Sequence, residues 1–295
     1  MMLNLFTMKP STSLIISTYN WPEALELCLL SVARQSQLPA EILIADDGSN
    51  PMTRSTVDRL RSTIGVPIVH LWHQDQGFRK AAIMNRAFVN ANGEYVIQID
   101  GDIVLHPDFI RDHINAATPG YFVAGTRVIT SEKLKNDLLH NKRINISIFE
   151  KGTRNFLNGV HFPLFGKLLR NYRCQTKDIY YVKGCNMAFW KKDLYQVNGY
   201  DETFEGWGYE DSDLAIRLYN SGVRKKFLKM AGIAYHLWHS EYCRDREQYN
   251  YSLLGDTRDC GKSYTKVGMD RYEQTKKPLL NFIVLKEAEM DWMSA

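Results

Sequence analysis

The sequence predicts an α/β fold in which a mostly parallel, Rossmann-like central sheet is covered by helices on both faces. Three observations support this fold class. Short apolar runs alternate with helical patterns through the first half of the chain. The runs have the pattern of strands buried on both faces, as in a sheet lying between two layers of helices. At least three runs end in polar clusters, which is where open sheets of this kind bind their ligands.

The first strand and helix follow from the pattern at the start of the chain. Residues 13–17 (SLIIS) form an apolar run that ends in a polar cluster, and a helical pattern follows. Asn20 is the expected N-cap of this helix, because Glu23 three residues later completes a capping box. One face of the helix is apolar and carries Leu25, Cys28, Leu29 and Val32.

The same alternation continues as far as residue 102. We expect strands at 41–45, 67–72 and 94–99, and helices at 53–64 and 80–90. The carboxyl ends of parallel strands meet at one edge of the sheet, so the polar residues that follow them should converge on one crevice. These residues are Thr18, Asp46, Asp47, Asp100 and Asp102.

The second half of the chain begins with a different kind of segment. Residues 131–177 are basic and also carry leucines and aromatic residues. One interpretation is a solvated helical or looped insertion, and the other is a lid or a patch that contacts a membrane or an acceptor. Regular structure is expected again at 179–189. A helix around 214–218 should end before Gly222, and a strand is expected at 233–235.

Composition excludes several classes of protein. The 295 residues are 44% hydrophobic and 24% charged, which is an ordinary globular composition. The net charge of +4 comes without a basic block interleaved with aromatic residues, so no nucleic-acid partner is expected. Five cysteines without a Cys-x-x-Cys pair indicate reduced thiols, and no apolar run approaches the ~20 residues that span a bilayer. We therefore expect a cytoplasmic protein, with peripheral contact at the inner face of the plasma membrane if residues 131–177 form a membrane patch.

The sharpest chemical feature is the triplet Asp100-Gly101-Asp102, which directly follows an apolar strand. Carboxylates are hard oxygen ligands that suit Mg²⁺ or Mn²⁺. Such a triplet can also be a simple turn with two exposed acids, and Asp46-Asp47 can likewise be an Asx turn that closes its strand. The strand before the triplet and the motifs elsewhere favour the metal interpretation.

As an ordered set, the motifs resemble the family 2 glycosyltransferases of the GT-A fold, over about residues 11–245. In the first half they are 17–20 (STYN), 46–49 (DDGS), 77–81 (GFRKA) and 100–102 (DGD). The second half, with 184–189 (GCNMAF) and 206–213 (GWGYEDSD), resembles the acceptor-side region of bacterial chondroitin polymerases and β-1,4-galactosyltransferases. The resemblance implies a GT-A fold and transfer of a sugar from a nucleotide donor.

On the donor side, the resemblance implies a role for each matching residue. Thr18 and Tyr19 match positions that hold the uridine, and Asp46 matches the acid that reads uracil or ribose, with Asp47 as its neighbour. Arg79 matches a basic residue near the diphosphate, which a guanidinium can contact in a forked geometry. Asp100 and Asp102 match the motif that binds the metal and the ribose-diphosphate, with Asp102 as the direct metal ligand.

On the acceptor side, the resemblance implies a general base within Glu210-Asp211. We assign the base to Asp211 and acceptor binding to Glu210, although both are also acids that the N-terminal dipole of a helix favours. Trp207 suits stacking on a sugar face, or else is a core tryptophan. Gly184 and Asn186 belong to the expected donor-sugar and acceptor pocket.

A His-x-x-His pair, His236 and His239, follows the last expected strand. In the related enzymes a histidine near this position completes the metal shell, and we favour His239 slightly, with His236 as a second ligand or a neighbour. Imidazole nitrogen favours Mn²⁺ over Mg²⁺. The sequence therefore predicts a metal site at Asp102, His239 and His236.

These expectations define a domain organisation and a function. Residues 1–128 form a nucleotide-sugar-binding half, residues 129–260 form an acceptor-binding half with a basic insertion at 131–177, and residues 261–295 form a C-terminal segment that is helical or extended. The predicted activity is inverting, metal-dependent transfer from a UDP-sugar, with UDP-galactose or UDP-N-acetylgalactosamine slightly favoured. The acceptor is a saccharide hydroxyl in cell-surface polysaccharide or lipooligosaccharide synthesis. The alternatives are a non-catalytic sugar-binding or scaffold subunit and, less favoured, a sugar nucleotidyltransferase.

Overall fold

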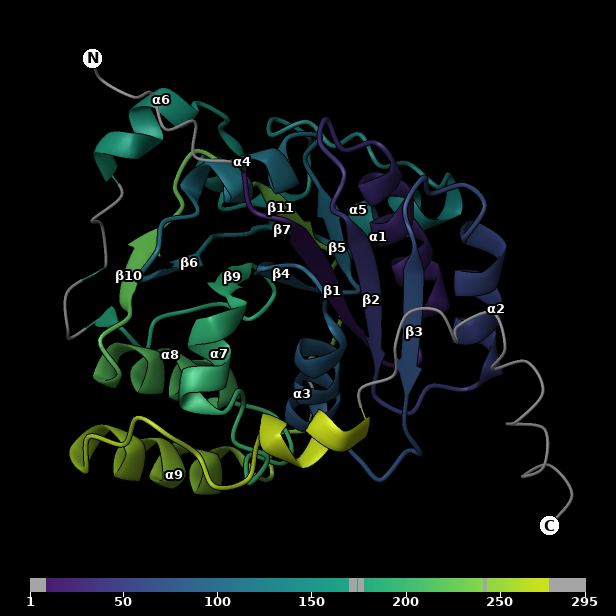
Figure 1. Cartoon of the computed structure of the whole chain (residues 1–295). Helices are drawn as coiled ribbons and strands as arrows, with labels where there is room; N and C mark the ends of the chain where they lie inside the picture. Colours follow the sequence, from purple (N-terminus) through teal and green to yellow (C-terminus); the bar gives the residue numbers. More distant parts are fainter. Residues whose placement is uncertain (1–8, 170–173, 175–177, 241–242, 276–295) are drawn as a thin grey trace, which may run out of the picture.

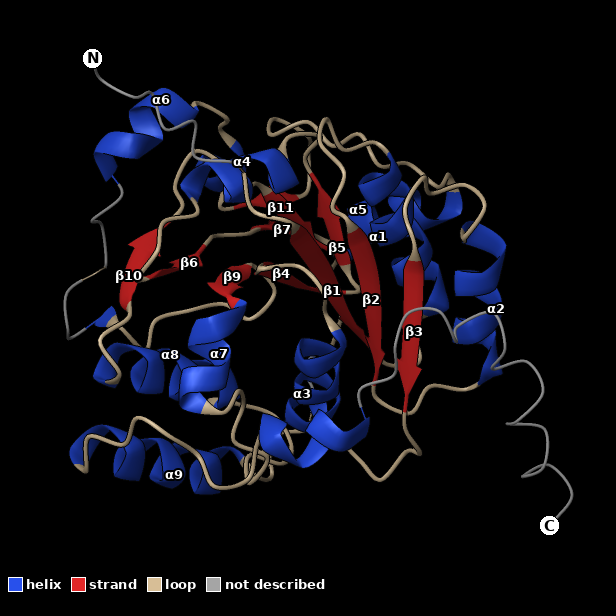
Figure 2. Cartoon of the chain, in the orientation of Figure 1, coloured by secondary structure: helices blue, strands red, loops and turns tan. Residues whose placement is uncertain are grey.

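A computed structural model describes residues 9–169, 174, 178–240 and 243–275 of the chain (Figure 1). A seven-stranded sheet runs through the centre of these residues, with helices on either side (Figure 2). Its strands, in spatial order, are β10 (Arg224–Phe227), β6 (Tyr121–Ala124), β9 (Met187–Trp190), β4 (Tyr95–Asp100), β1 (Thr12–Thr18), β2 (Glu41–Asp46) and β3 (Ile68–Trp72). The strand pairs are parallel except for those of β9, which is antiparallel to both of its neighbours.

The central strands are apolar on both faces because both faces are covered. Leu14 and Ile16 of β1 pack into a cluster with α1 (Pro22–Ala33), α2 (Pro51–Leu60) and α4 (Phe109–Ala116). Ile15, which points to the opposite face, packs with α3 (Lys80–Asn90), α7 (Lys191–Val197) and α8 (Glu210–Asn220). This confirms the predicted mostly parallel sheet between two layers of helices.

A second, smaller sheet lies beside the first and was not predicted as a unit. It has four strands in the order β5 (Ile103–Leu105), β11 (Ala234–His236), β7 (Val128–Thr130) and β8 (Thr153–Arg154). The sequence indicated only the strand at 233–235. Because β5 directly follows Asp100-Gly101-Asp102, this small sheet brings residues 234–236 next to the acidic triplet.

Two predicted helix boundaries are wrong. The first helix begins at Pro22 with Trp21 at the N-cap, and the Asn20 side chain instead accepts a hydrogen bond from the Asn50 N–H at 2.9 Å. Proline at the first helical turn needs no N–H partner and sets the start of the helix. The second helix spans Pro51–Leu60 instead of 53–64, because Asn50 caps it and accepts from the Met52 N–H at 2.9 Å.

The basic segment forms short elements over its described residues. They are α5 (Glu132–His140), β8, η1 (Phe156–Gly159), α6 (Pro163–Gly166) and η2 (Lys167–Leu169). Farther on come α9 (Glu247–Asp259) and η4 (Met269–Thr275), and the predicted C-terminal segment beyond residue 275 lies outside the described residues. Over the described part of the chain, no helix combines the length and apolarity needed to cross a membrane.

Candidate active site

A cleft of about 550 Å³ opens at the carboxyl ends of β1 and β4. Its wall combines the ends of these strands with the loops at 182–185 and 207–209, the start of α8 and the segment after β11. The predicted site residues that line it are Thr18, Tyr19, Asp47, Asp100, Asp102, Gly184, Trp207, Glu210, Asp211, His236 and His239. Three predicted residues, Asp46, Arg79 and Asn186, are not among the lining residues.

Asp102, His236 and His239 meet at one point of the cleft wall. The Asp102 Oδ2 atom lies 3.3 Å from His236 Nε2 and 3.4 Å from His239 Nε2. The second carboxylate oxygen of Asp102 is buried and has no hydrogen-bond partner in the protein. One oxygen and two imidazole nitrogens that converge in this way fit a divalent cation of the Mn²⁺ type.

The fold itself creates this arrangement. Strand β11 pairs antiparallel with β5 so that His236 lies opposite Ile103, the residue after Asp102. The Leu237 N–H donates to the Asp102 carbonyl at 2.9 Å, which continues the pairing past the strand end. His239 Nδ1 donates to the Ser240 carbonyl at 2.7 Å, and this tautomer leaves the Nε2 lone pair directed at Asp102.

Burial shifts the pKa values of Asp102 and His236 toward their uncharged forms. Desolvation raises the pKa of Asp102, and the neighbouring Asp100 adds to the rise, while the two histidines oppose it. Desolvation also lowers the pKa of His236 below its ordinary value. A neutral His236 is the form that can ligate a metal, and a bound cation would offset the cost of burying the Asp102 carboxylate.

Asp100 faces a different partner. Its Oδ1 atom accepts from the Lys80 ammonium at 2.7 Å and from the Ser17 hydroxyl at 2.7 Å. Burial alone would raise the pKa of Asp100, but Lys80 and Ser17 outweigh it, so the pKa is lowered. Burial would lower the pKa of Lys80, but the carboxylates of Asp100, Asp211 and Glu210 hold it well above its usual value. The Lys80 ammonium therefore stays positively charged and interacts with the carboxylates of Asp100, Asp211 and Glu210.

Glu210 and Asp211 begin α8, where the positive end of the helix dipole faces the cleft. Asp211 Oδ1 accepts from the Tyr200 hydroxyl at 2.6 Å, and the Gln98 amide donates to the same hydroxyl at 2.6 Å. A Cβ atom on Gly184 would lie 2.1 Å from an Asp211 carboxylate oxygen. Only glycine at 184 therefore leaves room for the Asp211 carboxylate in this position.

Glu210 is buried and titrates near neutrality. Desolvation, followed by repulsion from Asp211, raises the pKa of Glu210 to about 7. A carboxyl group with a raised pKa in the folded state stabilises the fold at pH values below its unfolded pKa, and this contribution is lost as the pH rises through about 7. The negative charge at this end of the cleft is therefore pH-dependent near neutrality.

The structure changes the assignment of the two acidic residues at the end of β2. Asp46 is buried, and its two oxygens bond to the Ser49 N–H at 2.8 Å and to His70 Nε2 at 2.8 Å. It holds the loop after β2, while its neighbour Asp47 lines the cleft. The expectation that Asp46 faces the cleft is wrong, because consecutive residues at a strand end point to opposite sides.

Arg79 and Asn186 are also placed differently from expectation. The Arg79 guanidinium donates to the Gln74 carbonyl at 3.3 Å, and its neighbour Lys80 enters the cleft instead. Asn186 is completely buried behind the wall, where its amide donates to the Thr126 carbonyl at 2.7 Å and the Gly232 carbonyl at 2.9 Å. Asn186 therefore fixes loops that shape the cleft and does not line it.

At the cleft rim, Trp207 is half-buried. The Arg244 guanidinium lies over its ring, 4.5 Å from the centroid. Tyr19 is also at the rim, and its hydroxyl donates to Asp75 Oδ2 at 2.8 Å. Both rings therefore border the cleft in positions where a base or a sugar could stack on them.

Sequence reasoning missed several residues that matter in this cleft. Lys80 was inside a motif that was quoted, but the adjacent Arg79 received the role. Tyr200 and Gln98 gave no signal, since their contact with Asp211 exists only after folding. Arg127 lines the cleft and carries a pKa raised by Cys185, Asp100 and Asp102 against the opposing effect of burial.

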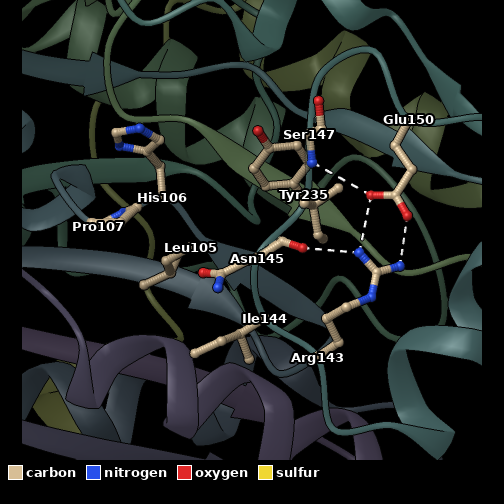
Figure 3. A pocket seen from close by; sticks show the side chains of 10 residues that line it. Leu105, His106, Pro107, Arg143, Ile144, Asn145, Ser147, Glu150 and Tyr235 are labelled. Carbon is tan, nitrogen blue, oxygen red and sulfur yellow. Dashed lines mark hydrogen bonds and ion pairs between the residues drawn. The ribbon is translucent and has the colours of Figure 1, made fainter.

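A second, smaller hollow of about 350 Å³ lies apart from the cleft, between residues 105–107 and 143–150 (Figure 3). Its charged lining side chains pair with each other, with Arg143 Nη2 lying 2.6 Å from Glu150 Oε1. Beside this hollow, His106, Asp108 and His161 form a second trio with the same residue types as Asp102, His236 and His239. There, however, Asp108 pairs with Arg111 at 2.6 Å and His161 with Asp112 at 2.9 Å.

Two curated proteins are similar to this chain over about three quarters of its length. Chondroitin synthase from Escherichia coli is 28% identical over 241 residues, covering 76% of this chain and 34% of the relative. Validoxylamine A glucosyltransferase from Streptomyces hygroscopicus subsp. limoneus is 26% identical over 227 residues, covering 72% of this chain and 49% of the relative. The chain thus spans about a third to a half of these curated relatives.

Solved structures show the same fold at low sequence identity. TarS from S. aureus in complex with UDP has a TM-score of 0.59 and 16% identity, covering 92% of this chain and 71% of that one. The mannosyltransferase PcManGT from Pyrobaculum calidifontis, in complex with GDP-Man and Mn²⁺, has a TM-score of 0.52 and 20% identity. The match covers 85% of this chain and 62% of the mannosyltransferase chain. These neighbours confirm the GT-A fold.

Family models cover most of the chain. Residues 169–240 match the model described as the N-terminal domain of galactosyltransferase. Residues 13–195, more than half of the chain, match glycosyl transferase family 2. The cleft, the fold and these matches agree, and the chain belongs to glycosyl transferase family 2.

Proposed function

We propose that this glycosyltransferase is inverting and metal-dependent, and that it transfers a hexose or N-acetylhexosamine from a UDP-sugar to a saccharide hydroxyl. One observation carries the proposal: a single cleft holds the Asp102–His236–His239 trio and the Glu210–Asp211 pair. We place the acceptor in cell-surface polysaccharide or lipooligosaccharide synthesis, in keeping with the relatives. UDP-galactose and UDP-N-acetylgalactosamine are the first donors to test, because residues 169–240 match a galactosyltransferase model.

Asp102, His236 and His239 would hold the cation, and Mn²⁺ suits their mixed oxygen and nitrogen donors. When bound, such a cation neutralises negative charge on the diphosphate leaving group. Lys80 and Arg127 line the same cleft and supply further positive charge for the diphosphate. Thr18, Tyr19 and Asp47 border the space we assign to the uridine, within the half formed by residues 1–128.

Asp211 is the proposed general base. The acceptor oxygen attacks the anomeric carbon, its proton passes to an Asp211 carboxylate oxygen, and the bond to the diphosphate breaks with its electron pair leaving on UDP. Attack from the face opposite the leaving group inverts the anomeric centre, as in the inverting glycosidases. Glu210 and Trp207, beside the base, are assigned to the acceptor and its sugar face.

A non-catalytic sugar-binding subunit is the alternative function, and the buried charges argue against it. Asp102 and Glu210 are held in desolvated positions that raise their pKa values, so keeping them ionised costs stability that a binding scaffold has no need to lose. The nucleotidyltransferase alternative requires a glycine-rich triphosphate loop after the first strand. Residues 17–21 (STYNW) do not provide one.

A screen of UDP-sugars for release of UDP tests the proposed function. We expect release that depends on Mn²⁺, is lost with EDTA and increases when a saccharide acceptor is added. A product with inverted anomeric configuration, determined by NMR, is the expected stereochemistry. Sugar binding without UDP release from any donor and acceptor pair would support the scaffold alternative.

Tyr200→Phe tests whether the buried hydroxyl positions Asp211. Loss of its 2.6 Å hydrogen bond to Asp211 Oδ1 should lower kcat about tenfold, because the bond orients the carboxylate. KM for the donor should change little, since the hydroxyl does not contact the donor space. An unchanged kcat with reduced thermal stability would indicate a structural role alone.

A further inference from the structure

Large apolar side chains gather on the surface between residues 149 and 168. Among the residues that the structure describes, every exposed phenylalanine lies in this segment, together with three of the four exposed leucines. Leu168, Leu164 and Phe149 are the most exposed, at 77%, 71% and 83%. Such a concentration is larger than the scattered exposed apolar residues of ordinary surfaces.

The most prominent part of this surface, which we call the apolar ridge, consists of Phe162, Leu164, Phe165 and Leu168 on α6, η2 and the residue before them. Figure 1 places α6 at the periphery of the molecule. The rings of Phe162 and Phe165 are stacked, with their centroids 6.3 Å apart.

Backbone contacts hold the ridge in this outward position. The Phe162 N–H donates to the Met230 carbonyl at 2.9 Å, and a Cβ atom on Gly166 would lie 2.1 Å from the Lys229 carbonyl oxygen. The Lys229 ammonium in turn donates to Asn158 Oδ1 at 2.6 Å. The ridge is thus built against the core by its backbone while its large side chains point away.

The chain segment that contains the ridge carries formal charge of one sign. Residues 151–177 contain no aspartate or glutamate. The same residues contain six basic side chains: Lys151, Arg154, Lys167, Arg170, Arg173 and Lys177. Of these, Lys151, Arg154 and Lys167 are exposed, and the last three lie outside the described residues. Exposed apolar groups in a segment whose formal charges are all basic are the combination that anionic bilayer surfaces attract.

The earlier part of the basic segment does not share this character. Leu134 and Leu138 of α5 are buried. Lys142 pairs with Glu26 at 2.7 Å, and Arg143 pairs with both Asp137 and Glu150. The first part of residues 131–177 is therefore a folded, charge-paired insertion. From residue 151 to residue 177 the sequence has no acidic residue, and His161 of this part pairs with Asp112 at 2.9 Å.

We propose that the apolar ridge, together with the exposed Lys151, Arg154 and Lys167 of the same segment, docks the protein on an anionic phospholipid bilayer. The large side chains would enter the headgroup boundary, and the lysines and arginines would contact the lipid phosphates. The Asn158 amide donates to the Arg127 carbonyl at 2.9 Å, and Arg127 lines the cleft, so the docking surface is anchored to the cleft wall. The proposal does not depend on which sugar, if any, the cleft transfers.

Sedimentation with vesicles tests the docking surface. The full chain should bind vesicles of phosphatidylglycerol and phosphatidylcholine, bind pure phosphatidylcholine much less, and lose binding as salt is raised. Leu164→Ser with Leu168→Ser should lower the partition coefficient roughly tenfold or more, since both side chains would leave the bilayer. Lys151→Glu with Arg154→Glu should lower it at least as much on the anionic vesicles.

Matched controls use exposed residues elsewhere. Met52→Ser, an apolar change on α2, and Lys133→Glu, a charge change on α5, should bind vesicles like the unchanged protein. Unchanged UDP binding and an unchanged melting temperature would show that the variant with Leu164→Ser and Leu168→Ser is folded. Binding that is equal for all variants, or no binding to anionic vesicles, overturns the proposal. So does a dimer, measured by light scattering, that the leucine variant abolishes, because a second copy would then cover the ridge.

Discussion

Replacing Asp211 with asparagine is expected to lower kcat by roughly 10²–10⁴-fold, the range typical of general-base removal. The amide is nearly isosteric with the carboxylate and still accepts the hydrogen bond from Tyr200, so the cleft should keep its shape. It cannot accept the proton of the acceptor hydroxyl. Affinity for UDP with Mn²⁺, measured by calorimetry, should therefore remain within about twofold while turnover collapses.

Two further variants make this test specific. Asp256→Asn, the same chemical change on the exposed face of α9, should leave turnover intact. Glu210→Gln removes a carboxyl whose pKa is raised to about 7 and should affect KM for the acceptor more than kcat. If Glu210→Gln abolishes turnover while Asp211→Asn retains it, the base assignment is reversed and Glu210 takes the role.

Replacing Asp102 with alanine is expected to abolish the Mn²⁺-dependent part of UDP binding. Asp102 supplies the only carboxylate of the described trio, and one of its buried oxygens has no partner in the protein. Loss of a direct ligand should weaken metal affinity by at least about 100-fold, because even partners of metal ligands typically contribute about 10- to 100-fold. Calorimetry of Mn²⁺ and UDP measures both effects.

The second trio, His106, Asp108 and His161, offers a matched control. Asp108→Ala removes the aspartate of this trio, which has the same residue types as Asp102, His236 and His239, and it should leave Mn²⁺ affinity unchanged. Within the metal trio, His239→Ala should weaken Mn²⁺ binding more than His236→Ala, because the Ser240 carbonyl fixes the His239 tautomer for ligation. The opposite order would make His236 the main nitrogen ligand. Unchanged Mn²⁺-dependent binding in Asp102→Ala would remove the metal site altogether.

The sequence alone determined the four strands β1–β4, the helices α1–α3 and α8, the short strand β11 and the family. The spacing of hydrophobic residues along the chain is a local property, so runs such as 13–17 and 41–45 identify strands buried on both faces. For the same reason, α3 spans Lys80–Asn90 as predicted. Asp100-Gly101-Asp102 could be placed at a strand end for the same reason. Helix starts were less well predicted, because whether Asn20 caps its own helix or bonds to Asn50 depends on a residue 30 positions away.

Only the tertiary structure decided which side chains enter the cleft. Adjacent residues of a motif are equivalent in the sequence but point in different directions in the fold. At the end of β2 the cleft is lined by Asp47 and not by Asp46, and at the start of α3 it is lined by Lys80 and not by Arg79. Pairing of β5 with β11 brings His236 to Asp102, and folding brings Tyr200 and Gln98 to Asp211. These contacts join residues that are far apart in the chain and depend on strand register and packing, which no local pattern encodes.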